Sequence, residues 1–179
     1  MATVTVKDAL SSTQKKVFSR LKWLNRLNFL AILATLYLTY LHYKPSASSI
    51  CNFGDYLNCD IVNQSTYSEL FGIPVAILGL LTYLFLFLVG RAMLKNYKFY
   101  KIWKWLRPFR IFWIMFAVIA VGVLFSLYLS YIEFFVLRAL CIFCLAQQII
   151  IIIDLFLILS ILSAVDEGNK SNPNVCEFC

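Results

Sequence analysis

The chain has 179 residues, of which 61% are hydrophobic, 17% are aromatic and only 14% are charged. A chain with so few polar side chains cannot cover a water-soluble globular domain, so the composition excludes that class and favours an integral membrane protein. The formal net charge is +7, because 16 Lys and Arg residues stand against 9 Asp and Glu residues.

The chain begins with a polar segment, residues 1–22, that has no clear periodicity and is expected to lie in the cytoplasm. Four apolar windows follow, and about 20 residues of helix suffice to cross a hydrocarbon core of about 30 Å. The sequence therefore predicts an all-α membrane domain over residues 23–165, a four-helix bundle, and a cytoplasmic tail over residues 166–179. The four helices are expected at about residues 24–43, 72–90, 110–131 and 140–163.

The basic residues predict the orientation of the bundle, because short segments rich in Lys and Arg stay in the cytoplasm. Of the 16 basic residues, 13 lie in the N-terminal segment or between the second and third windows, so both termini are expected to be cytoplasmic. This sorting explains the net charge without a nucleic-acid partner, which is the alternative use of a basic linker. A second alternative is a secretory signal cleaved near Ser46–Ser48.

The other side of the membrane should receive two cysteine pairs. Cys51 and Cys59 lie in an irregular polar segment after the first helix, and Cys141 and Cys144 open the fourth helix as "CIFC". Disulfides persist outside the cytosol, so the predicted topology and the cysteine positions agree. The first segment is expected to be flexible, and a short interfacial helix is expected near Ser65–Leu70.

Cysteines three residues apart at a helix start can form and exchange a disulfide, and the helix N-terminus favours the thiolate that attacks. If the flexible segment brings its sulfur to "CIFC", four cysteines in series can pass two electrons from an external dithiol to the membrane surface. A lipid-soluble quinone held between the helices, beside Cys144, could accept them. The alternative is a structural disulfide or two inert buried thiols.

Several motifs in this order resemble the vitamin K epoxide reductase family. They are Cys-x7-Cys in the first outer loop, Ser65 six residues after Cys59, "FGIP" with Gly79 at the second helix, and CxxC at the head of the fourth. The resemblance spans roughly residues 51–148. It is closer to the prokaryotic members, without the fused thioredoxin-like domain and fifth helix that many of them carry.

The resemblance implies that Cys51 receives electrons from a reduced thioredoxin-like partner, that Cys59 attacks Cys141, and that the freed Cys144 lies next to the quinone. Ser65 would order the loop or help to hold the quinone, although it can equally be an ordinary turn hydroxyl. The animal enzymes have a tyrosine where this chain has Gln148. Gln148 could still bond a quinone carbonyl, but epoxide chemistry is less strongly indicated.

The expected function is therefore a membrane thiol:quinone oxidoreductase that re-oxidises a secreted disulfide donor and supports disulfide formation. The acceptor would be a quinone of the menaquinone, ubiquinone or phylloquinone type. One alternative is reduction of a quinone epoxide, and a non-enzymatic one is a four-helix scaffold whose cysteines only staple a loop.

Four further residues are ambiguous in the sequence. Asp154 lies deep in the fourth helix, where an ionised acid costs roughly 2.5–3.5 kcal/mol on insertion scales, so it should face the bundle as a structural acid or a proton relay to the quinone. His42 could transfer protons or be an interfacial aromatic. Cys176 and Cys179 form a terminal CxxC of no assigned use, and no metal site is expected.

Overall fold

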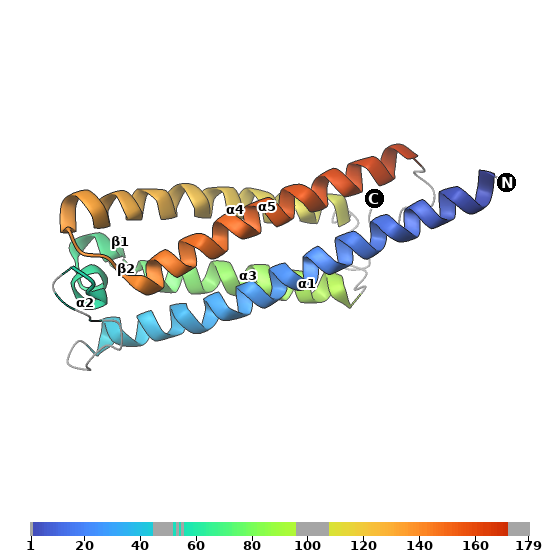
Figure 1. The fold of residues 1–179 in the computed structure, drawn as a ribbon. Coiled ribbons are helices and arrows are strands. Elements are labelled where there is room, and N and C mark those ends of the chain that lie inside the picture. The colour runs from blue at the N-terminus through green and yellow to red at the C-terminus, as the bar shows by residue number, and fades with distance from the viewer. Residues whose placement is uncertain (1, 45–51, 53, 55, 96–107, 172–179) are drawn as a thin grey trace.

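The computed structural model describes residues 2–44, 52, 54, 56–95 and 108–171. Within these residues, four long helices run alongside one another: α1 (Ala2–Tyr43), α3 (Val75–Leu94), α4 (Pro108–Tyr131) and α5 (Ile142–Ser171) (Figure 1). Each provides a stretch long and apolar enough to cross a membrane, and the stretches are Gln14–Tyr43, Val75–Leu94, Phe109–Leu137 and Ile142–Glu167. The predicted four-helix membrane fold is therefore confirmed.

Helix α1 supplies the central stripe of the core. Apart from Asn25, its buried residues recur at intervals of three and four, which puts them on one face of a helix, and they are Val17, Leu21, Leu24, Asn28, Ala31, Thr35, Leu38 and Leu41. This stripe differs from the expected non-periodic segment at residues 1–22, because the helix already begins at Ala2 and Val17 and Leu21 are part of the core. Likewise α5 continues to Ser171, past the expected end of the fourth helix.

The helices do not pack equally. Helix α1 packs along both α3 and α5, and α4 packs along α5, whereas α3 and α4 make few contacts with each other. Two glycines allow the close α1–α3 contact: a Cβ added at Gly79 would lie 3.3 Å from Thr35 Cγ2, and one at Gly90 would lie 3.1 Å from Asn25 Oδ1. The bundle is thus closed between α1 and α3 and loosely joined between α3 and α4.

A small cap covers one end of the bundle, opposite the end where α1 begins and α5 ends (Figure 1). It consists of helix α2 (Cys59–Asn63), a 3-10 turn (Thr66–Ser68) and a hairpin of strands β1 (Glu69–Leu70) and β2 (Ile73–Pro74). Phe71 and Gly72 turn the hairpin with φ of 54° and 77°. The expected interfacial helix is reduced to the 3-10 turn. Gly72 serves the hairpin turn and no close helix contact, because a Cβ added there would meet no atom within 4 Å.

Helices α4 and α5 are antiparallel neighbours joined by a short connection. That connection is not an open loop, because a π-helical turn (Ile132–Leu137) continues α4 and ends at Arg138, whose φ of 50° is left-handed. The wider turn of a π-helix changes which side chains face inward, and π-turns are frequent at functional sites. Here Ile132 and Glu133 are the buried members.

Candidate active site

Three cysteines from distant parts of the chain meet at the capped end. Cys59 and Cys141 are both completely buried in one apolar cluster with Leu38 and Val62, and Cys144 packs against that cluster. Cys59 is in a disulfide, whereas Cys141 and Cys144 are free thiols. Cys51 lies outside the described residues.

Cys59 is held firmly in place. It is the first residue of α2, which Asn58 caps by accepting hydrogen bonds from the backbone N–H groups of Asp60 and Ile61. The Asn52 side chain accepts a further bond from the Cys59 N–H at 3.1 Å. These bonds hold the start of α2 at this end of the bundle, and the flexibility expected of the segment stays a prediction.

Main-chain hydrogen bonds tie the cap to the residue that precedes the CxxC motif. The Leu140 N–H donates to the Tyr56 carbonyl at 2.8 Å, and the Asn58 N–H donates to the Leu140 carbonyl at 3.1 Å. Leu57 and Leu140 thus form a parallel bridge. Because each bridge residue is next or nearly next to a cysteine, this pairing sets Cys59 against Cys141.

The CxxC thiols share a buried carboxylate that the sequence did not indicate. Glu133 is only 4% exposed, its Oε2 accepts a hydrogen bond from the Cys141 N–H at 3.1 Å, and its carboxylate also hydrogen-bonds the Cys144 side chain. The Cys144 N–H lies 3.3 Å from the Cys141 sulfur. The only available signal was an acid within an apolar connection eight residues before Cys141, and the π-helical turn that buries it leaves no signature in the sequence.

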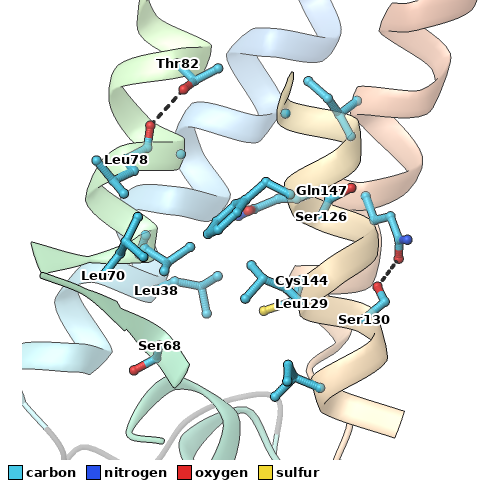
Figure 2. A pocket seen from close by; sticks show the side chains of 18 of the residues that line it. Leu38, Ser68, Leu70, Leu78, Thr82, Ser126, Leu129, Ser130, Cys144 and Gln147 are labelled. Atoms are coloured by element: carbon cyan, nitrogen blue, oxygen red, sulfur yellow. Dashed lines mark hydrogen bonds between the residues drawn. The ribbon is translucent and has the colours of Figure 1, made fainter. Parts of the chain in front are cut away.

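A cavity of about 610 Å³ opens between α3 and α4, where these helices barely touch. Its walls are mainly apolar and come from α3, α4, α5 and the cap, and the sulfur of Cys144 points toward its interior (Figure 2). The volume is within the range of roughly 300–1,000 Å³ for small-molecule sites. Cys144 therefore belongs both to the dithiol and to the cavity wall.

The two glutamines after Cys144 both line the cavity but differ in their bonding. The Gln148 Oε1 accepts a hydrogen bond from the Ser130 hydroxyl at 2.6 Å, which ties α5 to α4 (Figure 2). The Gln147 Nε2 is buried and has no hydrogen-bond partner among the described residues. Gln147, which the sequence did not single out, is therefore the better-placed donor for a polar atom in the cavity.

Ser65 lies in the cap, and His42, near the end of α1, bonds to the cap. Ser65 lines the cavity, and its hydroxyl donates to the Val62 carbonyl at 2.8 Å, a local bond that orders the end of α2. The His42 ring bonds the Asn63 carbonyl at 2.9 Å and lies 3.3 Å from Glu69 Oε1. His42 therefore joins α1 to the cap, and these two contacts involve no cysteine.

The remaining sequence candidates lie elsewhere. Asp154 is fully buried and accepts a hydrogen bond from the Asn28 side chain at 2.9 Å, so the expectation that it faces the bundle is confirmed. Cys176 and Cys179 are outside the described residues. Within those residues, no group of three or more His, Cys, Asp or Glu side chains could hold a metal ion.

A comparison with known protein families shows to which family this chain belongs. The sequence matches the Vitamin K epoxide reductase family over residues 22–159. The chain belongs to this family. It is accordingly a membrane oxidoreductase of the vitamin K epoxide reductase type, a family that acts with quinones in general. No curated protein matches the sequence. Membership also removes the alternative of a non-catalytic scaffold stapled by its disulfides.

Proposed function

We propose that the protein is a thiol:quinone oxidoreductase that takes electrons from a thioredoxin-like dithiol protein and gives them to a quinone of the menaquinone, ubiquinone or phylloquinone type. The single observation that carries this proposal is the position of Cys144, which contacts Cys141 and Glu133 on one side and lines the apolar cavity on the other. Free thiols beside a cavity that can hold a lipid-soluble molecule are suited to electron transfer.

The electrons would enter through the cap. Cys51 would exchange with the partner dithiol, and Cys59 would then attack the Cys141–Cys144 disulfide at Cys141, leaving Cys144 as a thiol. Cys51 would next attack Cys59 in the Cys59–Cys141 mixed disulfide, which re-forms the Cys51–Cys59 disulfide and leaves Cys141 and Cys144 as a dithiol. The burial of Cys59 and Cys141 in one cluster supports this choice of sulfur, since exchange requires direct contact between the attacking and attacked atoms. Oxidation of Cys141 and Cys144 back to a disulfide then releases two electrons and two protons.

Glu133 would act as the proton acceptor for this oxidation. The thiolate is the reactive form of cysteine, and a carboxylate hydrogen-bonded to the thiol can take its proton as the sulfur reacts. The Cys141 N–H holds the carboxylate in this position. Glu133 thus orients one cysteine of the motif and deprotonates the other.

The cavity residues fit a quinone. A quinone ring with its isoprenoid chain is largely apolar and carries two carbonyl acceptors, and when bound it supplies the capacity to accept two electrons and two protons. The unpartnered Gln147 Nε2 can donate to one carbonyl. Gln148 and Ser65 would shape the cavity wall through their bonds to Ser130 and Val62. The sparse contact between α3 and α4 would give the quinone a path from the lipid.

The orientation in the cell membrane remains as the basic residues predict it. The start of α1 and the end of α3, which carry many of the basic residues, lie at the end of the bundle opposite the cap (Figure 1). If that end is cytoplasmic, the cysteines 51, 59, 141 and 144 face the extracytoplasmic side, where a disulfide can persist.

The test is quinone reduction by the purified protein with reduced thioredoxin as the donor and a menaquinone as the acceptor. Cys144→Ala should abolish quinol formation, and Cys51→Ala, which lacks the thiol that resolves the intermediate, should accumulate a Cys59–Cys141 mixed disulfide, detectable by mass spectrometry. The Cys176→Ala/Cys179→Ala variant is the matched control and should keep the normal rate. Quinol formation at the normal rate by Cys144→Ala would refute the proposal, and turnover of an epoxide but not of the quinone would favour epoxide reduction.

A further inference from the structure

A buried polar cluster lies in the middle of the bundle, away from the cysteines. Asp154 on α5 and Asn28 on α1 are both fully buried, and Asn28 Nδ2 donates to Asp154 Oδ2 at 2.9 Å and to the Leu24 carbonyl at 2.8 Å. At 1.5 Å per residue, Asp154 lies about 15 Å along α5 from Cys144. This depth places the carboxylate near the centre of the membrane, where acidic side chains are costly and usually functional.

The hydrogen bond between Asn28 and Asp154, which joins α1 to α5, leaves other polar atoms of the cluster without a partner. Three side-chain oxygens in it have no partner within the described part of the chain: Oδ1 of Asp154, Oδ1 of Asn28 and Oδ1 of Asn25. Buried polar atoms without partners are uncommon, and such groups are places where water or a proton can bind. These three oxygens can therefore accept hydrogen bonds in addition to the one that joins α1 to α5.

These groups are arranged in series along the bundle. Toward the cap, Tyr83 of α3 lines the cavity, its hydroxyl donates to the Gln147 carbonyl at 3.1 Å, and it is close enough to Asp154 for the two to interact electrostatically. Toward the opposite end, Asn25 follows Asn28 within one helical turn. Farther along α1, Arg20 donates to the Ser160 carbonyl at 2.7 Å. Polar groups thus occur at intervals between the cavity and the basic end.

We propose that Asp154, with Asn28 and Tyr83, conducts protons from the basic, cytoplasmic end of the bundle to the quinone in the cavity. The inference rests on the proposed function. The Cys141–Cys144 dithiol gives two electrons to the quinone and releases two protons through Glu133 to the outer side. Two protons taken up through Asp154 complete the quinol. The reaction then moves charge across the membrane, in addition to forming a disulfide.

The competing route carries the thiol protons directly to the quinone within the cavity. Both routes balance the same atoms and electrons, but only the route through Asp154 removes protons from the cytoplasmic side. A purely structural Asp154 would affect thermal stability without changing where protons are taken up. The sidedness of proton uptake therefore separates these alternatives.

The experiment uses the full chain in liposomes that contain menaquinone in the bilayer and a pH-sensitive dye in the lumen. Reduced thioredoxin, which does not cross the membrane, is added outside and selects the molecules whose cap faces outward. The wild-type lumen should become alkaline as quinol forms, by about two protons per quinol from the balance above, and an uncoupler should remove the signal. In Asp154→Asn, lumenal proton uptake should fall at least about tenfold, and Asp154→Glu should restore it.

The controls keep the test decisive. Ser163→Ala removes an exposed hydroxyl that, among the described residues, bonds the Leu159 carbonyl of its own helix, and this variant should behave as the wild type. Tyr83→Phe removes the hydroxyl of a second residue in the proposed proton path and should also lower lumenal proton uptake. Quinol formation with no change in lumenal pH, or an unchanged pH signal in Asp154→Asn, would overturn the inference while leaving the proposed function standing. Absence of quinol formation in the wild type would overturn both.

Discussion

Helix α3 has two contrasting sides. Toward α1 it packs so closely that side chains at Gly79 and Gly90 would press on Thr35 and Asn25, whereas toward α4 it leaves a cavity of about 610 Å³. Small residues at helix contacts in a membrane let backbones approach, and dispersion then holds the pair together. The comparison shows how a bundle with little polar surface can keep one contact rigid and reserve the other for a ligand.

The largest effect on activity is expected at Glu133, which lines the cavity between α3 and α4 and contacts the CxxC cysteines. Replacing Glu133 by Leu removes the proposed proton acceptor and leaves the Cys141 N–H without its carboxylate partner. Loss of general-base catalysis should lower the rate of quinol formation by about 10²-fold or more. The measurement is single-turnover oxidation of the Cys141–Cys144 dithiol, and Glu133→Gln should keep the hydrogen bond to Cys141 without restoring the rate.

The closed side can be tested by enlarging a glycine. Gly90→Leu should destabilise the bundle by about 1–3 kcal/mol, because its Cβ alone would lie 3.1 Å from Asn25 Oδ1. Gly122→Leu is the matched control on α4, where an added Cβ would meet Ile151 at an ordinary 3.5 Å beside the cavity. Thermal unfolding in one detergent compares the two, and equal losses would contradict the contrast between the two sides of α3.

The cavity between α3 and α4 can be partly filled by a substitution that leaves the cysteines unchanged. Val121→Trp places a large side chain on the cavity wall, and we expect the KM for quinone to rise by about tenfold, equivalent to 1.4 kcal/mol of binding free energy. Leu124→Trp on the same helix is the control, because Leu124 is 70% exposed and does not line the cavity. A normal KM in Val121→Trp would place the quinone elsewhere.

The smallest effect on quinone binding is expected at Gln147. Gln147→Leu removes a buried donor that has no partner, so the protein should become more stable by about 1–3 kcal/mol while quinone binding weakens several-fold. Gln148→Leu should instead lose stability, since Gln148 accepts a hydrogen bond from Ser130. Tm and quinone KM, measured on both variants, would show whether stability and binding change in opposite directions at Gln147.

The sequence alone was enough to predict that there are four long apolar helices and that Cys141 and Cys144 lie at the start of the last one. Long apolar windows predict membrane helices because a bilayer leaves the backbone few other ways to satisfy its hydrogen bonds. The positions of Cys141 and Cys144 at a helix start, and of Asp154 inside the bundle, followed from the same windows. Each of these features depends on local sequence alone.

The features that were missed depend on how helices are rotated and joined. Gln147 and Gln148 are neighbours in sequence but differ by about 100° around α5, so which one is left unbonded depends on the position of α4. Glu133 faces the thiols only because a π-helical turn extends α4. The short helix at Cys59 depends on a side-chain cap from Asn58 and on pairing with Leu140, a residue far away in the chain.

That pairing with Leu140 uses peptide groups, those of Tyr56 and Asn58 in one segment and that of Leu140 in the other. Amide bonds of this kind form with almost any side chain, so the surface around Tyr56, which is exposed, is free to vary in shape and polarity. Homologous proteins could therefore acquire different soluble redox partners through substitutions in this surface while the spacing between their buried sulfurs stays the same.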